Sequence, residues 1–166
     1  ASRLYPLFIM LLCFSAGISQ VKLPALISNN MVLQQKSKVA IWGWAAPGEK
    51  VTITTSWNNK STNVTTSADG KWKTSVKTSG AGGHYTIQFK ASNEITVENV
   101  LLREVWLAGG QSNMAFFLGK KRSASYTGVI NCEEEVKVAN YPLIRQIDVP
   151  NKNAGEPLQD FIGVWK

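Results

Sequence analysis

A glycine-rich segment near the middle of the chain contains residue types that could carry out acyl transfer. Gly109 and Gly110 are followed by a polar triplet, Gln111, Ser112 and Asn113. A serine hydroxyl attacks an ester carbonyl when a base activates it and when backbone N–H groups hold the developing oxyanion. We therefore take Ser112 as the candidate nucleophile, with Gly110, Gln111 and Asn113 as candidate oxyanion and pocket residues.

The residues around the triplet predict how the serine would be presented. Residues 103–108 contain a short apolar run, which is typical of a strand buried on both faces. A serine just past such a strand lies where open α/β sheets place their ligand crevices. A helix beginning at residues 114–118 would direct its free N–H groups toward Ser112 and favour negative charge there. The segment is not a G-x-S-x-G elbow, because Met114 takes the second glycine position, so a plain polar turn is the alternative interpretation.

Three parts of the sequence carry a family resemblance. They are residues 104–107 (EVWL) with 110–114 (GQSNM), residues 26–35 (LISNNMVLQQ) with 39–49 (VAIWGWAAPGE), and residues 139–145 (ANYPLIR). Together they resemble the sialate O-acetylesterase family, a branch of the SGNH-type serine hydrolases. The resemblance extends over residues 21–166.

This resemblance implies a carbohydrate O-acetylesterase. Ser112 would form an acetyl-enzyme with an O-acetylated sugar or glycan, and water would then release acetate, with no metal and no other cofactor. The family resemblance also implies a catalytic histidine paired with an aspartate in an Asp-x-x-His motif near the C-terminus of the full protein. The present sequence contains no such motif. We therefore expect an N-terminal fragment of a longer enzyme, inactive by itself.

The first 20 residues have the pattern of a secretory signal peptide. Arg3 precedes a mostly apolar run over residues 4–18, which ends among small side chains. A membrane anchor is the alternative, but the run is shorter than the roughly 20 apolar residues that a span requires. We expect cleavage near Ser19 or Gln20, a secreted or periplasmic protein, and no membrane association after removal of the signal.

The charge pattern argues against a nucleic-acid partner. The formal net charge is +7 for 166 residues, but the lysines are dispersed over the expected strands, as on a solvated β surface. Only residues 120–122 (KKR) form a basic cluster. Nucleic-acid binding calls for basic residues gathered on one face together with aromatic ones, and no such face is apparent. The sequence does not predict an oligomeric state.

Residues 21–100 predict an antiparallel β-sandwich domain. Apolar and polar side chains alternate with a period of two in several short runs, for example over residues 51–57, 71–77 and 84–90. Turn sequences separate the runs: residues 47–48 (PG), 58–59 (NN), 69–70 (DG), 80–83 (GAGG) and 92–93 (SN). Several short strands at this spacing indicate a sandwich.

The β region is rich in tryptophan, with Trp42, Trp44, Trp57 and Trp72. Because these rings share the parity of apolar neighbours, we expect them to fill the core, with Trp42 and Trp44 as the one candidate sugar-stacking pair. A secreted glycan-binding β-sandwich module without catalysis is therefore the alternative to an esterase. A third possibility is that the β domain only supports the catalytic domain. His84, the single histidine, has polar parity and is expected on the surface, outside any catalytic role.

Residues 101–166 predict the start of an α/β domain. The strand at 103–108, a helix at 133–139 and a strand at 143–149 would form one βαβ unit of a parallel sheet. The resemblance implies a flavodoxin-like SGNH hydrolase domain, here incomplete. Residues 133–135 (EEE) are not expected to bind a metal, because consecutive helical carboxylates point in different directions. The predicted fold is therefore mixed: a β-sandwich followed by the first βαβ portion of a truncated hydrolase domain.

Overall fold

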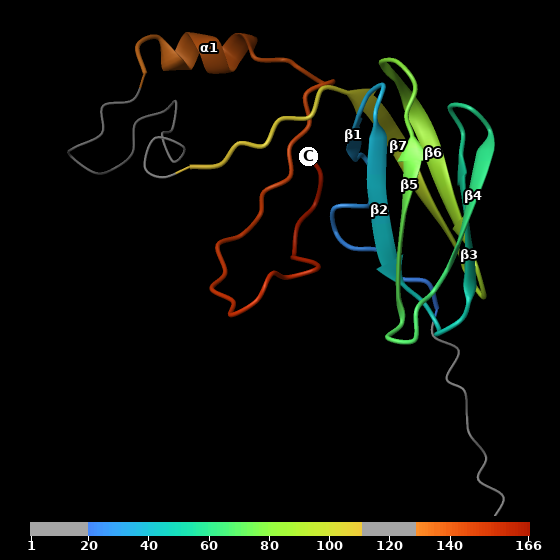
Figure 1. Cartoon of the computed structure of the whole chain (residues 1–166). Coiled ribbons are helices and arrows are strands. Elements are labelled where there is room, and N and C mark those ends of the chain that lie inside the picture. Colours follow the sequence, from blue (N-terminus) through green and yellow to red (C-terminus); the bar gives the residue numbers. More distant parts are fainter. Residues whose placement is uncertain (1–19, 111–128) are drawn as a thin grey trace, which may run out of the picture.

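The computed structural model describes residues 20–110 and 129–166. In this part of the chain seven strands come first and one helix follows (Figure 1). The strands are β1 (Val32–Gln34), β2 (Lys38–Trp44), β3 (Lys50–Thr55), β4 (Lys60–Thr65), β5 (Lys71–Lys77), β6 (Gly82–Lys90) and β7 (Glu94–Arg103); the helix is α1 (Cys132–Val138). The chain is thus mostly β, as the period-two alternation predicted.

The strands form two sheets. Five of them pair in the order β1-β7-β6-β3-β4, and β2 pairs with β5 in a separate two-stranded sheet. All pairings are antiparallel except that of β1 with β7, which is parallel and sets Val32 opposite Leu101. The five turn sequences lie at or beside the five connections from β2 to β7, so the strand boundaries follow the local turn chemistry.

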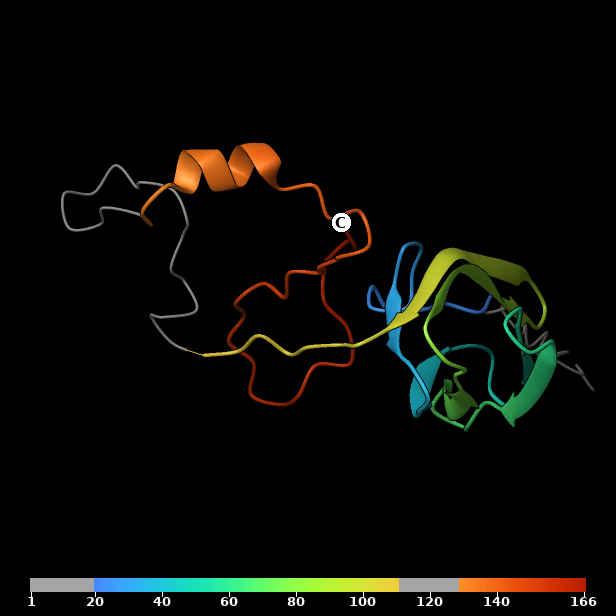
Figure 2. The ribbon, with the colours of Figure 1, turned by 90° about the horizontal axis from the view of Figure 1, so that it is seen from above.

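One core lies between the two sheets. The buried faces of β2 and β5 contribute Ile41 and Trp72, and the larger sheet contributes Ile53 and Phe89 among others. The rings of Trp72 and Phe89 join the sheets, with centroids 5.9 Å apart. Seen from above, the strands curl around this core (Figure 2). The inward residues alternate with exposed ones along β5, which confirms the predicted period.

The second half of the described chain contains much less regular structure. The predicted helix at 133–139 is confirmed as α1, with three glutamates in its first turn and Lys137 in its last. These charges suit the helix macrodipole. The strands predicted at 103–108 and 143–149 do not form: β7 ends at Arg103, and residues 143–149 carry no strand. A parallel strand buried on both faces requires neighbouring strands and covering helices, and the described residues provide neither for these two segments.

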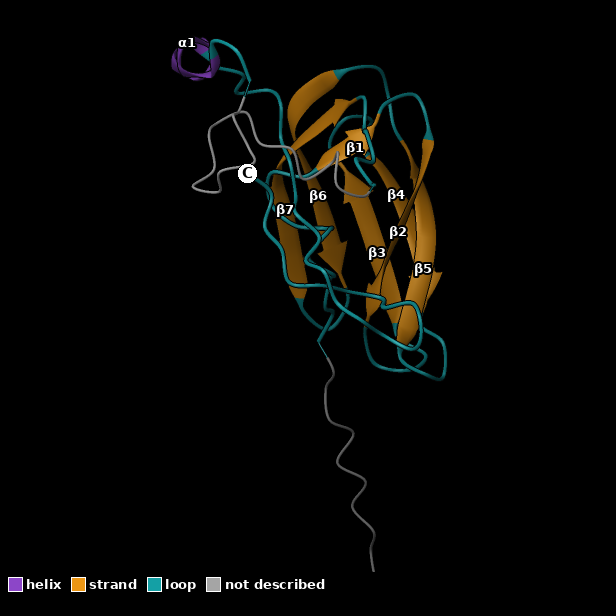
Figure 3. Cartoon of the chain, turned by 90° about the vertical axis from the view of Figure 1, so that its left-hand side faces the viewer, coloured by secondary structure: helices purple, strands orange, loops and turns teal. Residues whose placement is uncertain are grey.

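Exposed apolar side chains are concentrated in this second half. Every large hydrophobic side chain found exposed in the described residues lies between Val105 and Val164, and none lies in residues 20–104. Figure 3 shows the second half mainly as loops beside the strands. The apolar residues here are therefore not gathered into a core of their own. Among the described helices, none combines the length and apolar character needed to cross a bilayer.

Candidate functional site

The structure describes one of the four predicted site residues. Gly110 ends the described segment that leaves β7, and it is exposed. Gln111, Ser112 and Asn113 lie outside the described residues, so their roles and mutual arrangement stay predictions. What the structure does show is how the chain approaches and leaves this region.

Two glutamine side chains hold Glu104 and Val105, the first residues of the segment that leads from β7 toward Ser112. Glu104 accepts hydrogen bonds from Gln34 Nε2 at 2.7 Å and from Gln35 Nε2 at 2.8 Å, and Gln34 Oε1 accepts from the backbone N–H of Val105 at 2.9 Å. The amide donors of Gln34 and Gln35 lower the pKa of Glu104, because they favour its ionised form. We call Gln34, Gln35 and Glu104 the first anchor.

Beyond the first anchor the chain moves out into solvent. Trp106 is 87% exposed and Leu107 is 97% exposed. Two such large apolar side chains side by side are unusual on a protein surface and indicate a segment that packs against something else. Gly109 and Gly110 follow, and Gly109 has no neighbouring atoms within 4 Å of where a side chain would begin.

A second anchor holds the chain where it returns, and it centres on Arg145. The Arg145 guanidinium donates to the backbone oxygens of Asn30, at 2.9 Å, and Asn99, and also to the Asn99 side-chain oxygen at 3.0 Å. Asn99 Nδ2 in turn donates to Asn30 Oδ1 at 2.7 Å. Partial burial lowers the pKa of Arg145 through desolvation, but the group stays charged because its ordinary pKa is so high.

The backbone at this anchor explains why asparagines occupy it. Asn30 and Asn99 have φ values of 67° and 56°, in the left-handed region that asparagine tolerates better than most residues. His84, with φ 56°, also reaches this cluster through a 2.6 Å contact from Nδ1 to Asn99 Oδ1. His84 is exposed, as predicted. The sequence analysis did not find this cluster; the Asn29-Asn30 dipeptide is the one local signal that could have indicated a turn there.

Residues near the end of the chain also dock on the β domain. Trp165 is buried and donates from Nε1 to the Leu26 backbone oxygen at 3.0 Å. Asp160 Oδ1 accepts from the Ala25 backbone N–H at 2.8 Å. The segment from Arg145 onward is therefore attached to the β domain at several points, although it carries no strand.

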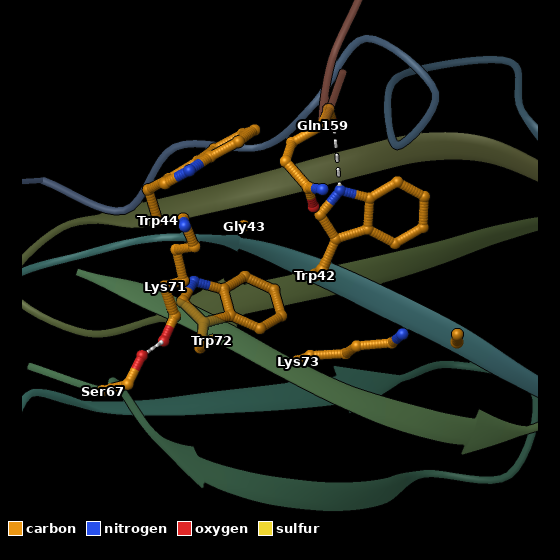
Figure 4. A pocket seen from close by; sticks show the side chains of 9 residues that line it. Trp42, Gly43, Trp44, Ser67, Lys71, Trp72, Lys73 and Gln159 are labelled. Atoms are coloured by element: carbon orange, nitrogen blue, oxygen red, sulfur yellow. Dashed lines mark hydrogen bonds between the residues drawn. The ribbon is translucent and has the colours of Figure 1, made fainter. Parts of the chain in front are cut away.

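A cleft lies on the outer face of the two-stranded sheet. It has a volume of about 400 Å³ and is lined by Trp42, Trp44, Lys71, Lys73 and Gln159 among others (Figure 4). The expectation that the tryptophans fill the core is confirmed for Trp72, which is 2% exposed. Trp42 and Trp57 are half-buried and pack against the core. The expectation is wrong for Trp44, whose half-buried ring lies on the outer face because Gly43 takes the inward position of β2.

Neither a cluster of metal-ligand side chains nor a pair of histidine and nucleophile is assembled in the residues the structure describes. No group of three or more histidine, cysteine, aspartate or glutamate side chains converges within residues 20–110 and 129–166. His84 contacts Asn99 and not a hydroxyl nucleophile.

Comparison with solved structures identifies the class of protein to which this arrangement is similar. The structure of a carbohydrate acetylesterase from Xanthomonas citri superposes with a TM-score of 0.76 and 30% sequence identity, over 89% of this chain and 32% of that one. The shared fold and sequence associate the chain with the carbohydrate esterases.

Curated relatives then show which family the chain resembles. Sialate O-acetylesterases from Homo sapiens and Pongo abelii are each 30% identical over 162 residues, covering 90% of this chain. The enzyme of the same name from Rattus norvegicus is 29% identical over 175 residues. The predicted resemblance to the sialate O-acetylesterase family is thereby confirmed. The chain spans about 29% of the length of the first two relatives. No protein-family model matches the chain.

Proposed function

We propose that the chain is the N-terminal part of a carbohydrate O-acetylesterase that hydrolyses acetyl esters on sugars, with sialate O-acetyl esters as the first candidate substrates. The observation that carries this proposal is the 30% identity over nine-tenths of the chain to proteins named sialate O-acetylesterase. The similarity to a carbohydrate acetylesterase structure supports it independently.

Ser112 is the proposed nucleophile. Its Oγ attacks the acetyl carbonyl as a base takes the hydroxyl proton, the sugar oxygen leaves with a proton, and an acetyl-enzyme remains. Water then attacks this ester and releases acetate and the free serine. The backbone N–H of Ser112 and that of a neighbouring glycine such as Gly110 would hold the oxyanion, and losing one such donor costs about 3–4 kcal/mol. Gln111 and Asn113 would shape the pocket around the ester.

The domain organisation follows the same proposal. Residues 21–100 would be an antiparallel β-sandwich, and residues 101–166 would supply the first part of an SGNH-type α/β domain. The exposed Trp106 and Leu107 support this division, because they are the side chains that a completed parallel sheet would bury. The two anchors support a bracing role for the β domain, since they fix the chain on either side of the segment that contains Ser112.

The base needed by Ser112 is proposed to lie in a later Asp-x-x-His pair. His84, the one histidine of the chain, lies in β6 and contacts Asn99, so it is poorly suited to activate Ser112. A serine hydroxyl without a base is a weak nucleophile. We therefore propose that the 166-residue chain alone has no esterase activity.

Hydrolysis of p-nitrophenyl acetate tests two proposals: that Ser112 is the nucleophile, and that the 166-residue chain alone is inactive. The substrate should be turned over by a protein extended through the reading frame beyond Lys166, but not by the 166-residue chain. Replacing Ser112 by Ala in the extended protein should remove turnover, and replacing Ser67, which lies in the β region, should not. Turnover by the 166-residue chain that survives Ser112→Ala would contradict the proposal.

We also propose that the protein is exported and that residues 1–20 are removed. Among the described residues the core begins at Val21, which is 2% exposed and donates from its backbone N–H to Asn93 Oδ1 at 2.6 Å. Cleavage at the predicted site would therefore leave the packed domain complete. Mass spectrometry of protein recovered from the medium or periplasm should show a mature N-terminus near residue 20.

A further inference from the structure

The outer face of the two-stranded sheet combines aromatic rings with positive charges in a regular pattern. Trp42 is paired across the strands with Lys73, and Trp44 is paired with Lys71. All four side chains project from the same face, because Ile41 and Gly43 occupy the alternate, inward positions. The face therefore carries two rings in a row on β2 beside two ammonium groups in a row on β5.

The aromatic part of this face is held in place. Trp42 donates from Nε1 to the Gln159 backbone oxygen at 3.2 Å, so residue 159 forms a wall of the cleft (Figure 4). The partly buried Trp42 also packs against the core, whereas Trp44 does not. A fixed ring offers a flat apolar surface with little entropy to lose on binding, and such surfaces suit the C–H faces of pyranose rings.

The charges determine which kind of sugar fits. Lys71 forms an ion pair with Asp69 at 3.0 Å, which offsets part of its charge. The two ion pairs that the described residues form do not include Lys73. Figure 4 shows the Lys73 ammonium group directed away from Trp44, at the end of the cleft where Lys73 is paired with Trp42. A carboxylate on a stacked sugar would therefore find an available ammonium group, in a protein with a net charge of +7.

From these observations we infer that the cleft between Trp42 and Trp44 binds a carboxylate-bearing sugar, with Lys73 receiving the carboxylate and the tryptophan rings receiving the pyranose face. Sialic acids and uronic acids share this chemistry. None of the residues 104–110 lines the cleft, and the inference does not depend on the esterase reaction.

The test is a tryptophan-fluorescence titration of the 166-residue chain with three probes: α2,8-linked oligosialic acid, oligogalacturonate and neutral xylo-oligosaccharide. We expect saturable binding of at least one acidic probe, weakened by raising the salt from about 0.05 M to about 0.5 M, and much weaker binding of the neutral probe. The acidic probe that binds with the higher affinity shows whether the cleft prefers a sialic acid or a uronic acid.

Three substitutions separate the parts of the site. Trp44→Ala removes a ring outside the core and should weaken binding about tenfold, and Lys73→Glu should weaken the acidic probes by at least as much. Lys38→Glu makes the same charge change at the far end of the same sheet, outside the cleft, and should change binding less than about twofold. Melting temperatures equal to that of the parent protein would show that the variants are folded. If Lys73→Glu is misfolded, the milder Lys73→Ala replaces it in the test.

Two results would overturn the inference. One is that neither acidic probe gives a saturable change in tryptophan fluorescence. This face of the sheet would then be a surface for contact with another protein. The other is binding that Trp44→Ala and Lys73→Glu leave unchanged. Titration in a Ser112→Ala background should give the same affinity as the parent, so the outcome is independent of whether the esterase proposal holds.

Discussion

Replacing Arg145 by Ala should release the docked second half of the chain from the β domain while leaving the core of that domain intact. The guanidinium makes three hydrogen bonds to Asn30 and Asn99. A buried hydrogen bond to a charged group contributes about 1.5–3 kcal/mol. Because Arg145 is half-buried and water can replace part of these bonds, we expect a total loss of about 2 kcal/mol, which corresponds to a factor of about 30 in the docking equilibrium.

Hydrogen exchange of individual amides measures this equilibrium. Gln146 and Lys166 donate their backbone N–H groups to each other's carbonyl oxygens at 3.1 Å and 2.9 Å, so they report on docking. The Leu101 N–H, which donates to Met31 in the β domain, reports on global unfolding. Arg145→Ala should accelerate exchange of the first two amides about 30-fold and leave the Leu101 amide unchanged.

Arg145→Lys is the matched control for charge. Lysine keeps the positive charge but replaces the planar fork of donors with a single ammonium group, so it should recover only part of the protection. Unchanged exchange at Gln146 and Lys166 in Arg145→Ala would refute the reasoning. An equal loss of protection at Leu101 would also refute it, because the anchor would then be part of the global core.

Two further predictions concern the β domain itself. Gly43→Ala should lower the free energy of urea unfolding by about 1–3 kcal/mol, because the new Cβ would lie 2.7 Å from the Trp72 ring and closer still to the Lys22 backbone oxygen; an unchanged value would show that the ring can move away. Asp69 should titrate with a pKa of about 2, below its usual 3.8, because the Ser67 hydroxyl and then Lys71 favour its ionised form. Because the pKa of Asp69 is lowered, any stabilisation by this group is present above pH 4 and is lost as the pH falls through about 2. Ser67→Ala should raise the pKa of Asp69 measured by NMR, and an unchanged pKa would contradict this assignment.

The strands of the β domain could be predicted because their signals are local. Alternation along residues 71–77 and turn pairs such as Asp69-Gly70 specify strand and turn without reference to distant parts of the chain. The parallel pairing of β1 with β7 could not be found in this way, since Val32–Gln34 is only three residues long and its partner is about 70 residues away. The same limitation applies to the second anchor, where Asn30, Asn99 and Arg145 meet only after folding.

Parity within a strand separates two faces but does not say which face is inside. The alternation in β2 grouped Trp42 with Trp44 correctly, yet their shared parity with apolar neighbours suggested the core. The structure places Gly43 inward instead, opposite Trp72, so one large ring takes the space that the glycine leaves. The size of a cross-strand partner, which no single-strand pattern contains, determined the outcome.

Apolar runs mark segments that must be covered, but they do not specify the cover. Residues 105–108 were predicted as a buried strand from composition alone, whereas in the structure Trp106 and Leu107 are exposed. The predicted strand and its predicted burial are therefore both wrong for the described residues 104–108. How Ser112 is presented depends on what covers residues 105–108. The presentation of Ser112 therefore stays a prediction.

The second anchor and the aromatic cleft are physically connected. The Gln159 backbone oxygen, which fixes Trp42, belongs to the same docked segment that Arg145 and Trp165 fasten to the β domain. A ligand in the cleft therefore contacts a wall that exists only in the docked arrangement, so binding and docking must favour each other by the same free energy. A β domain that only bound glycans would need no such attachment, because a flexible linker would suffice. The attachments at Glu104 and from Arg145 onward thus favour a β domain that braces the rest of the chain over one that only binds glycans.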